Sequence, residues 1–235
     1  MKNYLGELWD EIAKNIKLEE INPFPDLKDF KAKGKKGEIV IEGAVQHFKS
    51  EKIEKIAYGR YLMTGVEING VSIIPADNYD LPIFACNLSS TPRGINMDVD
   101  FYGTKDPIVN YNYLEKYYSP LKETYDEFLK LAQVKPLESD FFWSRTMRSP
   151  YFIKGLCPEP DSAPFINLSM KRLIKWLDLW KEAQPVKDEA EAGLIKKRKS
   201  MIRKVTAEGD PGKARYFDNI LEDKNIIQRI TDSMI

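Results

Sequence analysis

The sequence is poor in the residues that most often bind metals. It has one histidine, His47, and two cysteines, Cys86 and Cys157, among 235 residues. Two separated cysteines cannot form a disulfide framework or a four-thiolate metal site, and protein zinc sites usually draw on several histidines or cysteines. We therefore expect no bound metal, and the low cysteine count fits a reducing cytoplasm.

An excess of one charge and long apolar runs are also lacking. Lysine plus arginine and aspartate plus glutamate each total 36, so no net positive charge attracts nucleic acid or anionic membranes. No apolar stretch is long enough to cross a bilayer, and residues 1–18 lack the apolar region of a signal peptide. We expect a cytoplasmic protein, or one of the plastid stroma in a plant or alga, with no transit peptide and no nucleic-acid or membrane partner.

Glycine-rich phosphate loops, dinucleotide-binding fingerprints and internal repeats are absent from the sequence. What is present is an ordinary globular composition, with 43% hydrophobic and 31% charged residues. A chain of this length can build one substantial core. We expect a single domain over residues 1–235, and a monomer.

Apolar periodicity predicts helices on both sides of a central run of strands. The N-terminal residues 5–16 have helical spacing, and so do residues 113–131, where Pro120 marks a start or break, and residues 166–180. The C-terminal region is helical with a break at Gly209–Gly212. Between these helices, short β-branched runs predict strands at Glu38–Val45, Ile53–Met63, Val66–Ile74, Pro82–Leu88 and Gly94–Phe101, with one more at Ser149–Leu156.

The connections between the predicted strands decide how the strands pair. They are too short to hold crossover helices, so the strands should be antiparallel. Helices that precede and follow such a sheet pack on its two faces. The sequence therefore predicts an α/β fold, a three-layer α/β/α sandwich with a central antiparallel β-sheet.

The most informative segment is Pro75–Asn87, which reads PADNYDLPIFACN. It resembles the signature of the ferredoxin-dependent bilin reductases, in which Leu-Pro-x-Phe precedes a polar catalytic position, here Asn87. Ser149–Lys154 is similar to the strand where this family places a basic residue that anchors a substrate propionate, and Lys154 keeps the charge. Thr206–Gly212 resembles the family's Asp-Pro element, in which Asp210 matches a catalytic aspartate.

The chain also departs from the family pattern. Gly70 stands seventeen residues before Asn87, where family members carry a polar residue. Asn69 could supply the missing amide if its strand were bulged by one residue, and Ser72 should point to the same face as Gly70. The family's final Phe-Leu-Phe is replaced by residues 232–235, Asp-Ser-Met-Ile. The product isomer is therefore not inherited from the resemblance.

The resemblance implies a reaction and a set of roles. Biliverdin IXα would be reduced to a phytobilin by electrons that reduced ferredoxin delivers one at a time, with no bound cofactor, through a substrate radical. Asp210 would donate a proton and Asn87 would hydrogen-bond the pigment, a pair that favours reduction at the A-ring side. Lys154, Arg145 and Arg148 would bind the two propionate carboxylates.

Simpler interpretations stand beside these roles. Asp210 precedes Pro-Gly and can serve as a helix cap or turn residue. Asn87 can hydrogen-bond backbone groups at the end of its strand. Arg145 and Arg148 can form surface ion pairs. We expect Asp100 to have a structural role, and His47 to be a strand-edge residue whose ring nitrogens have hydrogen-bond partners. The basic run at 196–199 is either a solvated helix face or, with Lys171, Arg172 and Lys175, a docking face for ferredoxin.

Two further functions remain open from the sequence. The chain could be a non-enzymatic tetrapyrrole carrier on the same fold, which the missing polar group at Gly70 favours. It could also be a reductase of linear chlorophyll catabolites, whose substrate is likewise an open-chain tetrapyrrole.

Overall fold

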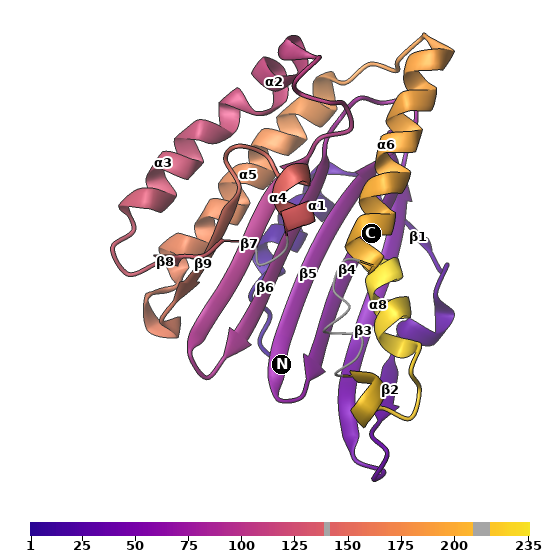
Figure 1. The fold of residues 1–235 in the computed structure, drawn as a ribbon, viewed down its shortest axis with the longest axis vertical. Coiled ribbons are helices and arrows are strands. Elements are labelled where there is room, and N and C mark those ends of the chain that lie inside the picture. Colours follow the sequence, from indigo (N-terminus) through magenta and orange to yellow (C-terminus); the bar gives the residue numbers. More distant parts are fainter. Residues whose placement is uncertain (139–141, 209–216) are drawn as a thin grey trace.

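A computed structural model describes residues 1–138, 142–208 and 217–235, and its centre is one antiparallel sheet (Figure 1). The strand order is β1-β3-β4-β5-β6-β7-β9-β8, and β2 also pairs with β3. The strands are β1 Glu19–Ile21, β2 Phe30–Lys33, β3 Ile39–Ser50, β4 Ile53–Met63, β5 Val66–Pro75, β6 Ile83–Thr91, β7 Gly94–Tyr102, β8 Lys135–Pro136 and β9 Ile153–Cys157.

The five strands β3 to β7 follow one another in chain order. Two-residue turns join β3 to β4, β4 to β5 and β6 to β7, whereas residues 76–82 connect β5 to β6. Between β4 and β5, Thr64 and Gly65 have φ angles of 49° and 82°, the left-handed values that a two-residue hairpin turn requires. Between β6 and β7, Thr91 pairs with Gly94 across another two-residue turn. These strands match the predicted ones closely, although β3 runs on to Ser50 instead of ending at Val45.

Some elements lack a local signal and were not predicted. They are the short strands β1, β2 and β8 and the short helix α4 (Phe142–Met147). The predicted strand at Ser149–Leu156 begins only at Ile153, and the predicted helix over 113–131 divides near Pro120 into α2 (Tyr111–Tyr117), η2 (Ser119–Leu121) and α3 (Lys122–Lys130).

One face of the sheet is covered by α1 (Gly6–Asn15), α5 (Ala163–Glu182), α2 and α3. Phe84, Cys86 and Leu88, alternate residues of β6, are buried in this layer, as the two-residue period of a strand requires. Trp176 of α5 is fully buried there and donates its indole N–H to the Pro82 carbonyl at 2.8 Å. This layer forms the larger apolar core of the protein.

The other face carries α6 (Glu189–Glu208) and α8 (Ile226–Met234), which lie in front of the sheet in Figure 1. Ile230 of α8 packs in the cluster around Val45 and Tyr61, while Ile202 of α6 packs against Ile83. The predicted α/β fold with a central antiparallel sheet is therefore confirmed, with helices on both faces. Two short 3-10 helices, η1 (Pro25–Leu27) and η3 (Glu159–Asp161), lie outside these layers' long helices, and residues 217–220 are also helical.

Two cations assigned to a docking face are buried instead. Arg172 of α5 is 0% exposed, donates Nη1 to the Val99 carbonyl at 2.9 Å and lies 3.8 Å from Asp100. Lys199 of α6 is 1% exposed and donates Nζ to the Pro75 carbonyl at 2.6 Å. The prediction that these two lie on the surface was wrong, because each occupies the inward side of its helix and has hydrogen-bond partners there.

Asp100 and His47 are buried and satisfied, in agreement with structural roles. Burial raises the pKa of Asp100, while Arg172 and hydrogen bonds from Ser149 oppose this rise. His47 Nε2 lies 3.0 Å from the Ser233 carbonyl, and burial lowers the pKa of His47.

None of the helices in the described ranges is both long and apolar enough to span a membrane.

Candidate functional site

A row of residues crosses the sheet on the face that α6 and α8 cover. Gly59 of β4 pairs with Gly70 of β5, Gly70 with Asn87 of β6, Asn87 with Asp98 of β7, and Asp98 with Lys154 of β9. Paired residues of neighbouring strands point to the same face. The row therefore changes from two glycines at one end to an amide, a carboxylate and an ammonium group at the other.

The neighbouring row is also made of small side chains. Ala57 pairs with Ser72, and Ser72 pairs with Ala85. With Gly59 and Gly70 they form a nearly flat surface on strands β4 to β6, which we call the two-glycine floor. Such a surface can accept a planar group close to the backbone, because no large side chain rises from it.

A cavity of about 160 Å³ lies over the part of this floor formed by Ser72 and Ala85. Its walls include Tyr61 and Tyr102 from the sheet, Ile202 from α6 and Met234 from α8. Pockets for small organic ligands usually measure about 300–1,000 Å³. A ligand of that size would have to displace a wall or extend beyond the cavity over the exposed side chain of Asn87.

The Met234 side chain is the part of the wall that lies on the floor. Its sulfur is 2.7 Å from the position that a β-carbon would take at Gly59. The Ser72 hydroxyl donates a hydrogen bond to the main-chain oxygen of the same methionine. The end of α8 is thus attached to the floor by both its side chain and its backbone.

The polar end of the row is a connected group of side chains. Asn87 Nδ2 donates to Asp98 Oδ1 at 3.1 Å, and that oxygen lies 4.0 Å from Arg148 Nη1. The Asp98 side chain is 22% exposed and that of Arg148 is 15% exposed. The group therefore borders solvent next to the floor.

Arg148 is held in a fixed orientation. Its guanidinium lies 4.9 Å from the ring centre of Tyr102 and 4.1 Å from that of Phe152, and its Nε donates to Ser144 Oγ at 3.1 Å. Among the described residues, its Nη1 has no hydrogen-bond partner. A fixed guanidinium with a spare donor is suited to a carboxylate or a carbonyl oxygen of a ligand.

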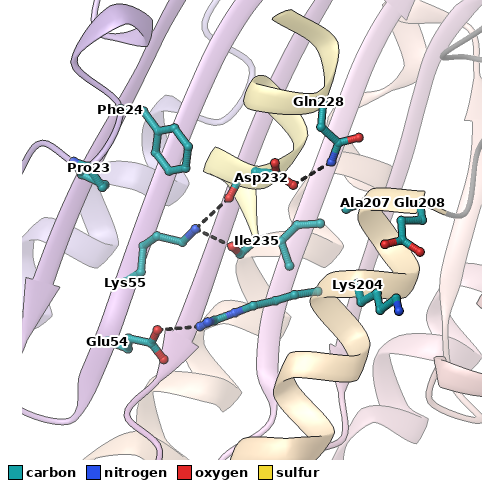
Figure 2. A pocket seen from close by; sticks show the side chains of 11 residues that line it. Pro23, Phe24, Glu54, Lys55, Lys204, Ala207, Glu208, Gln228, Asp232 and Ile235 are labelled. Atoms are coloured by element: carbon teal, nitrogen blue, oxygen red, sulfur yellow. Dashed lines mark hydrogen bonds and ion pairs between the residues drawn. The ribbon is translucent and has the colours of Figure 1, made fainter. Parts of the chain in front are cut away.

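A second, larger cavity of about 670 Å³ lies beyond Ile235, which lines both cavities. Figure 2 shows the Lys55 ammonium directed at the main-chain oxygens of Asp232 and Ile235. In the same cavity, Arg203 Nη2 donates to Glu54 Oε1 at 2.7 Å. Burial, with the nearby Arg203, lowers the pKa of Lys55 to about 8. No sequence motif marks this cavity, in which Arg203 pairs with Glu54 and Lys55 donates to main-chain oxygens.

No three histidine, cysteine, aspartate or glutamate side chains come together as a possible metal site within residues 1–138, 142–208 and 217–235. The side chains around the floor are instead apolar, hydroxyl-bearing and amide groups, with Arg148, Lys154 and Asp98 at the polar end of the row.

Comparisons with known proteins give a match of fold. No family model matches the sequence, and no curated protein matches it either. Among solved structures, one match covers 98% of this chain and 83% of the other chain, with a TM-score of 0.80. That protein is phytochromobilin synthase. It comes from tomato, was crystallised in its selenomethionine form in complex with biliverdin, and shares 16% sequence identity with this chain.

The likeness to phytochromobilin synthase confirms the predicted bilin reductase-like fold. At 16% identity it shows the fold alone. The roles of individual residues therefore have to be argued from the geometry of this chain.

The structure brings three of the predicted site residues together. Asn87 and Lys154 lie in one row with Asp98 between them, and Arg148 approaches that aspartate from the segment after α4. Arg145 lies elsewhere, 58% exposed and 3.7 Å from Glu138. Asp210 lies outside the described residues.

The suggested replacement of the polar group at Gly70 by Asn69 was wrong. The pairing of β5 with β6 is regular around Gly70, without a bulge. Asn69 therefore points to the opposite face, where it is 1% exposed. Ser72 does share the face of Gly70, but its hydroxyl is engaged with Met234.

Proposed function

We propose that the protein binds biliverdin IXα on the two-glycine floor and reduces it to a phytobilin with electrons from reduced ferredoxin. The observation that carries this proposal is the row from Gly59 and Gly70 to Asn87, Asp98 and Lys154. It offers a flat surface for conjugated rings beside a polar group for their nitrogen, oxygen and carboxylate atoms. The biliverdin in the structural neighbour supports the same class of ligand.

The pigment's two propionates need cations at the edge of an otherwise apolar site. Lys154 and Arg148 supply them at the polar end of the row, and Arg148 has a donor to spare among the described residues. Arg145, on the exposed side of α4, is an outer candidate. In this proposal the carboxylates lie toward β9 and the rings lie over β4 to β6.

In this proposal, the chemistry needs no bound cofactor. Ferredoxin supplies two electrons one at a time, the conjugated pigment carries the unpaired electron between transfers, and the protein supplies protons. Asn87 can hydrogen-bond a lactam oxygen or a pyrrole N–H, but it cannot release a proton at ordinary pH. Asp210 is the proposed proton donor, and together with Asn87 it favours reduction at the A-ring side.

The experiment is an anaerobic assay with biliverdin, ferredoxin and a ferredoxin-reducing system, followed by visible spectra and chromatography of the extracted pigment. We expect a spectral shift on binding, a transient radical and a reduced product. Asp210→Asn should still bind biliverdin but turn over at least about 10²-fold more slowly, since it removes a general acid. Normal turnover in this variant would remove Asp210 from the mechanism.

A non-enzymatic tetrapyrrole carrier is the second candidate. It is favoured by Gly59 and Gly70, which place no titratable side chain under the rings. A carrier would bind biliverdin with the same spectral shift and leave it unchanged under reducing conditions. The anaerobic assay therefore separates the two functions.

A further inference from the structure

Two carboxylates of β7 point to the face of the two-glycine floor, and only one of them is accessible to solvent. Asp100 is 0% exposed, accepts hydrogen bonds from the backbone N–H (2.8 Å) and hydroxyl of Ser149, and lies beside Arg172. Its oxygens are closed off by these partners. Asp98, two residues earlier, is partly exposed and adjoins Asn87.

The other strands under and beside the floor offer no further carboxylate on this face. The residues of β4, β5 and β6 that share the face of Gly59, Gly70 and Asn87 include no carboxylate, and the one charged residue among them is Lys55. On β9 the corresponding residues are Lys154 and Leu156. Within these fully described strands, Asp98 is thus the accessible acid nearest to the floor.

We propose that Asp98 delivers a proton to the bound tetrapyrrole, an inference that rests on the proposed function. After one electron arrives from the reduced iron–sulfur donor, the O–H bond of the Asp98 carboxylic acid breaks and a new bond to hydrogen forms on the pigment. The radical anion becomes a neutral radical, and solvent reprotonates the carboxylate. A second electron and a second proton complete the reduction of one double bond.

Pigment binding itself provides the reason for Asp98 to hold a proton. A pigment lying over the floor removes water from the Asp98 side chain, and loss of water favours the neutral form of a carboxyl group. Its propionates would also pair with Arg148 and Lys154 and so take these cations away from the Asp98 carboxyl group. Both effects act in the same direction, so binding and protonation are coupled.

Asn87 gives this carboxyl group a defined orientation. Its Nδ2 donates to Oδ1 of Asp98 at 3.1 Å, so in the protonated state the hydrogen belongs on Oδ2. Asn87 is then a positioning residue for the acid as well as a hydrogen-bond partner of the pigment. The same contact explains how an amide at this position can take part in a proton transfer that it cannot perform itself.

The first test measures proton uptake, which needs no turnover. Biliverdin is titrated into the protein by calorimetry near pH 6.5, in buffers with different ionisation enthalpies. We expect the wild type to take up as much as about one proton per pigment bound, and Asp98→Asn to take up much less at similar affinity. Asp98→Glu should retain the uptake, and Asp126→Asn, an exposed carboxylate paired with Lys122 on α3, should match the wild type.

The second test follows single turnover under anaerobic conditions. In Asp98→Asn the one-electron-reduced pigment should form but decay at least about 10²-fold more slowly, and the fall of the wild-type decay rate with rising pH should disappear. Equal proton uptake and equal decay in wild type and Asp98→Asn would overturn the proposal while leaving the reductase function intact. If wild-type protein bound no biliverdin, the proposed function and the role of Asp98 would both fail.

Discussion

The methyl carbon of Met234 lies 2.8 Å from the position that a β-carbon at Gly70 would occupy. The thioether of the last residue of α8 thus rests on the two-glycine floor, where the pigment rings are proposed to lie. The main-chain oxygens next to it are held by Ser72 and His47. Binding and the position of this side chain must therefore be linked.

Met234→Ala should increase biliverdin affinity by several-fold, because the side chain no longer has to leave the floor. The cost in unfolding free energy should stay below about 2 kcal/mol, since Met234 is only partly buried. Pigment titration and urea denaturation measure the two effects. Met201→Ala, 50% exposed on α6, is the matched control, and a weaker affinity in Met234→Ala would show that the thioether is a contact of the pigment instead.

Lys154→Gln should weaken binding of biliverdin by about 5- to 10-fold and leave binding of its dimethyl ester nearly unchanged. The charge-assisted contact to a propionate exists only for the free acid. A double-mutant cycle of protein variant and ligand ester isolates this contact. Lys135→Gln, an exposed lysine on neighbouring β8, serves as the control; an equal loss for acid and ester would place the propionates away from Lys154.

Lys197→Glu should slow reduction several-fold at limiting ferredoxin and low salt. Lys197 is exposed on α6, the helix whose Ile202 lines the floor cavity, and exposed charges are screened over about 10 Å at 0.1 M ionic strength. Initial rates across a salt series measure the effect, which should vanish at high salt. Lys31→Glu on β2 makes the same charge change elsewhere, and a similar effect there would argue against a local docking face.

The free energy of unfolding of the wild type, relative to Lys55→Met, should rise with pH above about 8. Burial lowers the pKa of Lys55 from 10.5 to about 8 in the folded protein, so between these values the unfolded chain binds more protons at this site. Stability then increases with pH over that window. Since Lys55 is partly exposed, the slope should stay below the single-site ceiling of about 1.4 kcal/mol per pH unit. Parallel stability curves from urea unfolding would contradict the assignment.

Gly94→Ala should destabilise the protein more than Gly65→Ala, although both glycines have positive φ angles, of 120° and 82°. A β-carbon at Gly94 would lie 2.2 Å from the Cys157 carbonyl, whereas no described atom lies within 4 Å of one at Gly65. The Gly65 variant should lose about 1–2 kcal/mol, and the Gly94 variant at least twice as much. Equal losses in urea unfolding would mean that β7 and β9 can separate at this point.

Much of this architecture could be predicted because two-residue turns link β4 to β5 and β6 to β7. Such turns fix register, so the pairing of Gly59 with Gly70, and of Asn87 with Asp98, follows from counting back from each turn. Asp98 could have been found in this way. The register alone does not separate it from Asp100, which points to the same face; only the packing shows that Asp100 is buried.

Other features depend on contacts between distant segments and carry no local signal. The strands β1, β2 and β8 are short and form by pairing with β3 or β9. The burial of Arg172 and Lys199 depends on how α5 and α6 lie on the sheet, which charge patterns do not reveal. The position of Met234 on the floor likewise depends on the docking of α8.

The two cysteines lie on the side of the sheet away from the floor. Cys86 and Cys157 are fully buried in the apolar layer formed with α5, and burial raises the pKa of each thiol. Because thiol reagents react with the thiolate, modification has to wait until that layer opens. The chain thus contains two native reporters of local unfolding, and their labelling kinetics follow the α5 layer independently of events on the opposite face.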